Sequence, residues 1–210
     1  MRRPPRPTRT GAEPATLRDL RRRQIVQEAR RIVARDGLGA LTISTLEARL
    51  PFSRGVITHH FEDKDEIVDA VLESAVADID AGTVADVRSM PDFAGRVAAV
   101  LRSKVTGFIE QPEATRILVS FWGQPGDARA RTSNAALFRR YRRESRALFE
   151  HAVETGEARR DLDPEAAAVL LVGAVIGIVS LAMFEPDTVD VDAATKLAAA
   201  QIVADARHRG

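Results

Sequence analysis

Residues 42–64, TISTLEARLPFSRGVITHHFEDK, predict two short helices, residues 42–49 and 53–60, joined by a tight turn. Thr42 is an N-cap residue type, and its side chain can accept a hydrogen bond from the first turn of the first helix. Pro51 ends that helix, because proline has no N–H to continue the hydrogen-bond ladder. We therefore expect a compact helix–turn–helix segment here.

The second of these helices has two different sides on a helical wheel. Ile57 and Phe61 share an apolar side that we expect to face the core, whereas Gly55, Thr58 and His59 lie roughly opposite. A glycine on the outer side lets another backbone approach closely. A polar helix on an apolar support is the arrangement with which a helix-turn-helix unit enters the major groove of DNA.

The rest of the chain continues in helical patterns. Apolar residues recur at i, i+4, i+7 and i+8 from Ile25, and Gly37 supplies a stop. Sustained alternation of the kind that predicts strands is absent. We expect an all-α fold of about nine helices, an N-terminal three-helix unit and a helical body. The expected helices are residues 18–36, 42–49, 53–60, a long helix after 63, and 92–110, 113–123, 127–155, 164–184 and 190–207.

Composition excludes several classes of protein. The chain has 210 residues, 45% of them hydrophobic and 29% charged, which is ordinary for a soluble globular protein and argues against disorder over most of its length. It contains no cysteine, so disulfides, cysteine-ligated zinc and a thiol nucleophile are ruled out. Paired carboxylates, a glycine-rich phosphate loop and a Ser/His/Asp motif are not evident, so we expect no catalytic residues, no metal and no cofactor.

Charge is unevenly distributed along the chain. Residues 1–64 hold 14 Arg and Lys against 7 Asp and Glu, a balance of 14 − 7 = +7, whereas the whole chain has a formal charge of +1. A basic N-terminal third on an acidic body suggests binding to a polyanion, although a solvated arginine-rich face would have the same composition. Residues 1–16 are rich in arginine and proline, so we expect a disordered basic arm without a secretory signal.

These motifs resemble a known family. The segment from Ile25 to Leu72, with SRGVITHHF at 53–61 and DKDEI at 63–67, is similar to the DNA-binding domain of the TetR family of bacterial transcription regulators. GVITHHFEDK is most similar to the BetI-like, choline-responsive branch. GEARRDLDPE at 156–165 resembles the family's lead-in to its penultimate helix.

The resemblance implies roles for individual residues on DNA. Thr42 and Lys64 match positions that touch phosphate, and His60 matches a position that packs beneath the DNA-facing side. Metal binding by His59 and His60 is disfavoured because adjacent helical residues point about 100° apart. The predicted DNA-binding set is Thr42, Ser53, Arg54, Gly55, Thr58, His59 and Lys64.

Two residues depart from the family pattern. Leu50-Pro51 replaces the usual Ala-Gly of the turn, and proline excludes a positive φ there. Glu47 stands where a small residue usually packs, and we expect it to point to the rim and pair with an arginine such as Arg49 or Arg54. Both changes bear on the tilt of the second helix.

The helix at 164–184 is apolar almost all round, so we expect it to be buried on most sides. Small residues there and on the last helix would allow close helix packing, and the family resemblance implies a four-helix interface between two subunits. A C2 dimer would also place two reading helices one turn of DNA apart, about 34–36 Å. An ordinary intramolecular core is the alternative. The predicted dimer contacts are Val172, Gly173, Ile176, Gly177, Leu197 and Ala198.

Aromatic residues gather in the middle of the chain and could line a ligand pocket or simply fill a core. The branch resemblance raises a quaternary ammonium ligand, which aromatic faces bind. With one Trp and one Tyr in the chain, such a cage would be thin. The candidate pocket residues are Phe108, Phe121, Trp122, Phe138 and Tyr141.

The sequence and the resemblance together predict a cytoplasmic, homodimeric transcriptional repressor that a small-molecule ligand releases from a palindromic DNA operator, with no role in membranes. Its expected parts are the arm (1–16), a DNA-binding domain (17–64) and a sensing and dimerisation domain (65–210). One alternative is an all-α enzyme or carrier without sequence-specific DNA binding. Another is a protein that coats DNA without regard to sequence.

Overall fold

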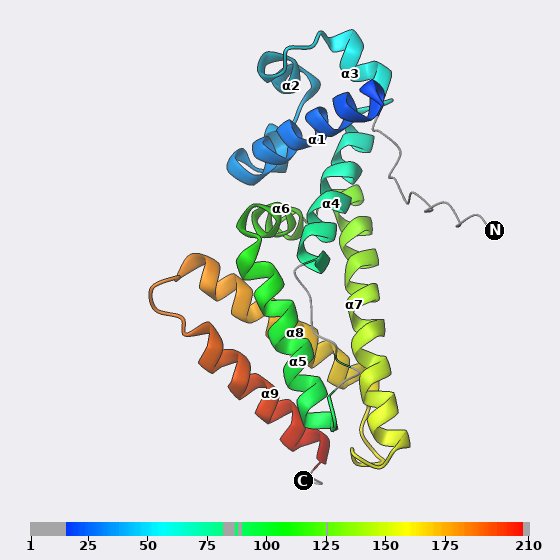
Figure 1. Ribbon diagram of the computed structural model, residues 1–210, viewed down its shortest axis with the longest axis vertical. Coiled ribbons are helices and arrows are strands. Elements are labelled where there is room, and N and C mark those ends of the chain that lie inside the picture. The colour runs from blue at the N-terminus through cyan, green and yellow to red at the C-terminus, as the bar shows by residue number, and fades with distance from the viewer. Residues whose placement is uncertain (1–15, 82–86, 88–89, 125, 208–210) are drawn as a thin grey trace, which may run out of the picture.

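The computed structural model describes residues 16–81, 87, 90–124 and 126–207, and this part of the chain contains helices and no strand (Figure 1). The expected all-α class is confirmed, and most of the predicted helix ends lie within one or two residues of those observed. The elements are α1 (Leu17–Asp36), the 3-10 turn η1 (Leu38–Ala40), α2 (Ile43–Arg49), α3 (Arg54–His60), α4 (Lys64–Ala81), α5 (Phe93–Glu110), α6 (Pro112–Trp122), α7 (Ala128–Glu154), α8 (Pro164–Phe184) and α9 (Val191–Arg207).

Helices α1 to α3 form one end of an elongated molecule (Figure 1). A capping box begins α1, because Thr16 Oγ1 accepts from the Asp19 N–H and the Asp19 carboxylate accepts from the Thr16 N–H. Ile25 and Ile32 on α1 are fully buried, and α2 and α3 pack against this helix. The long helix α1 thus supports the two short ones.

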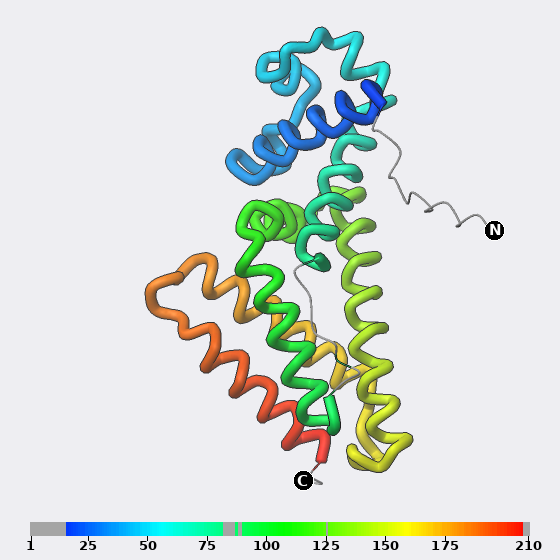
Figure 2. Tube along the Cα trace, in the orientation of Figure 1, coloured from blue at the N-terminus to red at the C-terminus, as the bar shows by residue number. Residues whose placement is uncertain are grey.

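Helices α4 and α6 connect this end to the body. In Figure 2, α4 runs from the end formed by α1 to α3 down into the body, and α6 packs against both α1 and α4. The Leu38 N–H donates to Ser120 Oγ of α6 at 3.0 Å. Because α4 contacts both halves, the boundary predicted at residue 65 stays a prediction.

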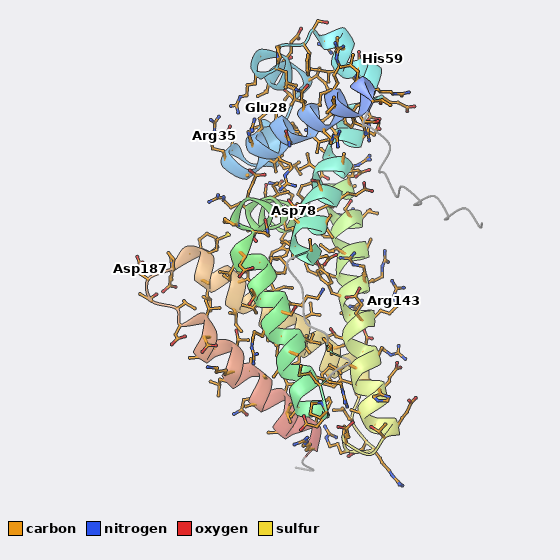
Figure 3. The ribbon with its side chains drawn as sticks, in the orientation of Figure 1. Glu28, Arg35, His59, Asp78, Arg143 and Asp187 are labelled. Carbon is orange, nitrogen blue, oxygen red and sulfur yellow. The ribbon has the colours of Figure 1, made fainter. Side chains whose placement is uncertain are left out.

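Arg30 is the most heavily bonded link at this junction. Its guanidinium on α1 contacts Asp78 at 2.6 Å and Ser74 at 2.6 Å on α4, and Glu113 at 2.9 Å on α6. The Arg30 side chain is only 11% exposed. Asp78, labelled in Figure 3, lies on α4 beside α6. One buried cation therefore joins three helices.

The body is built from the long α7, with α8 packed along it and α9 packed on α5 and α8. Helix α8 is buried or partly buried on most sides, as expected, although one side is open in the single subunit. Its length and mean hydropathy of 2.6 would allow it to cross a bilayer, but it packs on α5, α7 and α9. One side remains uncovered, and it consists of Ala166, Val169, Leu170, Gly173, Gly177, Leu181 and Phe184.

We predict that Arg30→Ala lowers the free energy of unfolding by about 1–3 kcal/mol, because it removes three charge-assisted contacts from a largely buried site. Arg31→Ala is the matched control, since Arg31 is 65% exposed and, among the residues that the structure describes, pairs only with Glu28 one turn away. The control should change stability by less than about 0.5 kcal/mol. Urea denaturation followed by circular dichroism measures both, and equal effects would contradict the assigned role.

Candidate DNA interface and internal cavity

The short helix α3 is anchored to the rest of the protein through its apolar side. Ile57 is fully buried and Phe61, the residue that ends the helix, is 1% exposed. Arg22 of α1 lies over the Phe61 ring at 4.1 Å and donates from Nη1 to the His60 carbonyl oxygen and to Glu66 Oε1, both at 2.9 Å. Arg22, which sequence reasoning did not single out, thus fastens the end of α3 to α1 and α4.

The opposite side of α3 is open to solvent, and so are all seven residues predicted to bind DNA. Figure 3 shows His59 at the end of the molecule. Within the described residues, the side chains of Arg54 and Lys64 have no carboxylate partner, so both cations are available to phosphate or base edges. Thr58 Oγ1 donates to the Arg54 carbonyl at 3.1 Å, which orients the hydroxyl.

The turn before α3 closes without a positive φ, as its proline requires. Leu50 has φ −104° and ψ 148°, which is extended backbone. Ser53 occupies the N-cap position but makes no capping hydrogen bond with its side chain. Instead Glu47 Oε1 accepts from the Arg54 N–H at 3.1 Å. Glu47 thus contacts the Arg54 backbone and not an arginine side chain, which corrects the expected pairing.

His60 is buried behind the exposed face, in agreement with a structural role. It is 9% exposed, and its Nδ1 atom has no hydrogen-bond partner within the described residues. Burial lowers the pKa of His60 below its usual 6.5, and the nearby positive charges of His59 and of arginines on α1 lower this pKa further. Protonation of His60 is therefore unfavourable in the folded protein.

A second candidate site is a small cavity between α5, α6, α7 and α8. Four of the five predicted pocket residues line it, namely Phe108, Trp122, Phe138 and Tyr141. Phe121 does not, because it is fully buried and points into the core. The cavity has a volume of about 20 Å³, which is room for about one water molecule. Its ligand-binding role remains a prediction.

Sequence reasoning missed the charged residue of this cavity. Lys104 lines it together with Ser145, and its ammonium lies 4.7 Å from the centre of the Tyr141 ring. Lys104 follows buried Leu101 by three residues and precedes buried Phe108 by four, so a single cation on the apolar side of its helix was the available signal. Burial raises the pKa of Tyr141 to about 12, which keeps its hydroxyl protonated at neutral pH.

The predicted dimer residues divide between two sides of their helices. Gly173, Gly177 and Leu197 are exposed, with Leu197 62% exposed, and Ala198 is partly buried. Val172 and Ile176 instead line the cavity, because they lie on the inner side of α8. The exposed apolar residues that the prediction missed are Val169, Leu170, Leu181 and Phe184.

Both parts of the chain match families of known proteins. Residues 25–71 match the family described as bacterial regulatory proteins, tetR family. Residues 93–205 match the family described as BetI-type transcriptional repressor, C-terminal. Among curated proteins, the HTH-type transcriptional regulator BetI of Burkholderia cenocepacia is 26% identical over 109 residues, which is 51% of this chain and 56% of that protein. The chain thus spans about half the length of the curated relatives that it matches.

Solved structures share the fold at low sequence identity. A transcriptional regulator from Saccharomonospora viridis, solved in complex with choline, is 19% identical and superimposes with a TM-score of 0.71 over 90% of this chain and 99% of its own. A TetR-family transcriptional regulator from Cytophaga hutchinsonii is 13% identical, with a TM-score of 0.73 over 94% of this chain and 100% of its own.

The buried His60 predicts a dependence of stability on pH. Its pKa is lower in the folded than in the unfolded state, so below about pH 6.5 the unfolded chain binds more protons and the free energy of unfolding falls as pH falls. His60→Leu should flatten this dependence between about pH 7 and pH 5, above the range in which carboxylates titrate. Urea denaturation at several pH values measures it. The exposed His151, changed to Leu, is the control, and an unchanged slope in the His60 variant would contradict the prediction.

Proposed function

Because the chain belongs to the TetR family of bacterial transcription regulators, we propose that it is a homodimeric repressor that binds a palindromic operator and is released by a small molecule. Members of this family are regulators and not enzymes, which removes the enzyme alternative. A repressor of this kind acts in the cytoplasm, on chromosomal DNA.

The observation that carries the proposal is the two-sided α3. Its apolar side is anchored through Ile57 and Phe61, and its outer side presents Arg54, Thr58 and His59. Arginine recognises guanine or phosphate, and a threonine methyl contacts thymine. Lys64 lies at the start of α4, where it would bind phosphate beside the groove. The arm arginines Arg2, Arg3, Arg6 and Arg9, which could enter the minor groove or attract phosphate without regard to sequence, lie outside the described residues.

The uncovered sides of α8 and α9 support the homodimer. The exposed residues of α8 recur every three or four positions from Ala166 to Phe184, so they form one continuous apolar side. Gly173 and Gly177 on that side would allow another helix to approach closely. Helix α9 exposes Leu197 among alanines. A second copy would cover these residues and supply the second α3 that a palindromic site requires.

The contacts of α6 support release by a ligand. Trp122, at the end of α6, lines the cavity, whereas Ser120 and Glu113 on the same helix bond to Leu38 and to Arg30 of the DNA-binding end. A ligand that displaces Trp122 therefore acts on a helix that also supports α1. Such a ligand favours release to the extent that it binds the released conformation more tightly. The choline of the Saccharomonospora viridis structure supports a small-molecule site in this fold.

Selection of bound oligonucleotides from a random pool should yield a palindrome. Thr58→Ala combined with His59→Ala should then reduce the preference for that site over scrambled DNA by about tenfold or more, because base contacts are lost. Salt-dependent binding to random DNA should remain, since it comes from phosphate contacts.

The matched control changes one threonine and one histidine that are exposed in the body, Thr188→Ala with His151→Ala, and it should leave both affinities unchanged. Fluorescence anisotropy at several salt concentrations measures all three proteins. Equal loss on selected and scrambled DNA would argue against base reading by α3 and favour a protein that coats DNA without regard to sequence.

A further inference from the structure

The wall of the internal cavity carries buried donors without acceptors. Trp122 Nε1 and Tyr141 Oη are both buried and have no hydrogen-bond partner within the described residues. An indole N–H can only donate, and a buried donor without an acceptor costs about 1–3 kcal/mol. Both residues line the cavity, so a ligand that enlarged it and brought an acceptor to these atoms would satisfy them.

The Lys104 ammonium is a third donor in the cavity wall, beside Trp122 and Tyr141. Lys104 is the only charged residue among those that line the cavity, and its side chain is 20% exposed. Its nearest carboxylates are Asp80 at 3.6 Å and Glu144 at 3.8 Å, both beyond the usual length of a charge-assisted hydrogen bond. Asp80 instead accepts from Arg140 at 2.7 Å. The ammonium of Lys104 thus has only these two long ion pairs, and an anion in the cavity could approach it more closely.

We propose that the effector of this protein is an apolar carboxylate. Its anionic end would bind the Lys104 ammonium and accept hydrogen bonds from Trp122 Nε1 and Tyr141 Oη, and its apolar part would pack against Phe108 and Phe138. The inference rests on the proposed function for the existence of an effector, and it names the chemistry that the cavity selects.

The same groups disfavour a quaternary ammonium ligand, in spite of the BetI-like resemblance. A quaternary ammonium has no acceptor for the Trp122 N–H, and it would lie close to the like charge of Lys104. The Tyr141 ring already has Lys104 at 4.7 Å and the Arg140 guanidinium at 5.0 Å from its centre. The one tyrosine that could contribute to an aromatic cage is thus already engaged by two cations.

The cavity has to enlarge to admit such a ligand, because about 20 Å³ holds no more than a water molecule. Trp122 and Phe138 are the aromatic residues of its wall that are only partly buried, with ring centres 5.8 Å apart. Rotation of these two side chains would open the space. Trp122 is the single tryptophan of the chain, so its fluorescence reports directly on this site.

Three probes with a common benzyl group test the choice of head group, namely phenylacetate, the neutral phenylacetamide and benzyltrimethylammonium. Each is titrated into the full-length protein without DNA, and Trp122 emission is recorded. We expect phenylacetate to bind at least about tenfold more tightly than either of the others, since it alone forms an ion pair with Lys104. Equal or tighter binding of the ammonium probe, or no binding by any probe up to millimolar concentrations, would overturn the proposal.

Variants of Lys104 test whether this residue gives the cavity its preference for a carboxylate. Lys104→Met should abolish the preference for phenylacetate over phenylacetamide, whereas Lys104→Arg should keep it because the cation remains. Lys196→Met, on the exposed side of α9, is the matched control and should bind all probes as the unaltered protein does. Thermal denaturation checks that each variant is folded. A preference for phenylacetate that survives in folded Lys104→Met would overturn the role of Lys104 and the proposal with it.

Calorimetry with Tyr141→Phe gives a second test that does not depend on the charge. This variant keeps the ring and removes the unsatisfied hydroxyl, so it should weaken phenylacetate and phenylacetamide, which both carry acceptors, more than benzyltrimethylammonium. Equal effects on all three probes would count against the proposal. This inference can fail while the proposed function holds. An ammonium compound that binds the protein and makes it release operator DNA would overturn the carboxylate inference and leave the proposed repressor function intact.

Discussion

Helix α3 has seven residues, and a helix that short is not stable in water by itself. It persists because Ile57 and Phe61 are buried beneath it and because Arg22 binds its last turn to both α1 and α4. That anchorage decides which side of α3 is left outside. With the apolar residues used for support, mainly small and polar residues remain on the exposed side, and the proposed DNA interface is a consequence of this packing.

Side chains also hold the two halves of the molecule together at their junction. Arg30 of α1 and the Leu38 N–H both bond to α6, and Arg129 of α7 bonds to α4. Arg129 bonds to Asp65 and Asp69 in the first turns of α4. Since α4 begins immediately after the turn that follows α3, these contacts help to fix the orientation of α3 relative to the body. Coupling between the sites requires two arrangements of this junction, and the ligand would favour one of them.

The sequence predicted the helices well because their signals are local. Thr42 caps α2 as expected, and the apolar spacing of Ile57 and Phe61 gave the buried side of α3. Contacts between distant segments left no such pattern, so Arg22, Arg30 and the bond from Glu47 to the Arg54 backbone were not predicted.

The aromatic content of the cavity was predicted and its charge was missed. Composition identifies phenylalanines and a tryptophan, but whether Phe121 or Phe108 lines the cavity depends on how four helices are rotated. Likewise, the uniformly apolar sequence of α8 gave no indication of which side would remain uncovered. Val172 and Ile176 face inward, whereas Leu170 and Leu181 do not.

The chain has no cysteine, so a single exposed residue next to α3 can be replaced and spin-labelled, and Glu62→Cys is suited to this. The distance between labels on the two subunits, measured by pulsed electron paramagnetic resonance, tests the paired insertion of α3 directly. On operator DNA we predict one narrow distance distribution, consistent with reading helices one turn of DNA, about 34–36 Å, apart. An absent dipolar signal, or a distance that does not change between the DNA-bound and the effector-bound protein, would contradict the account.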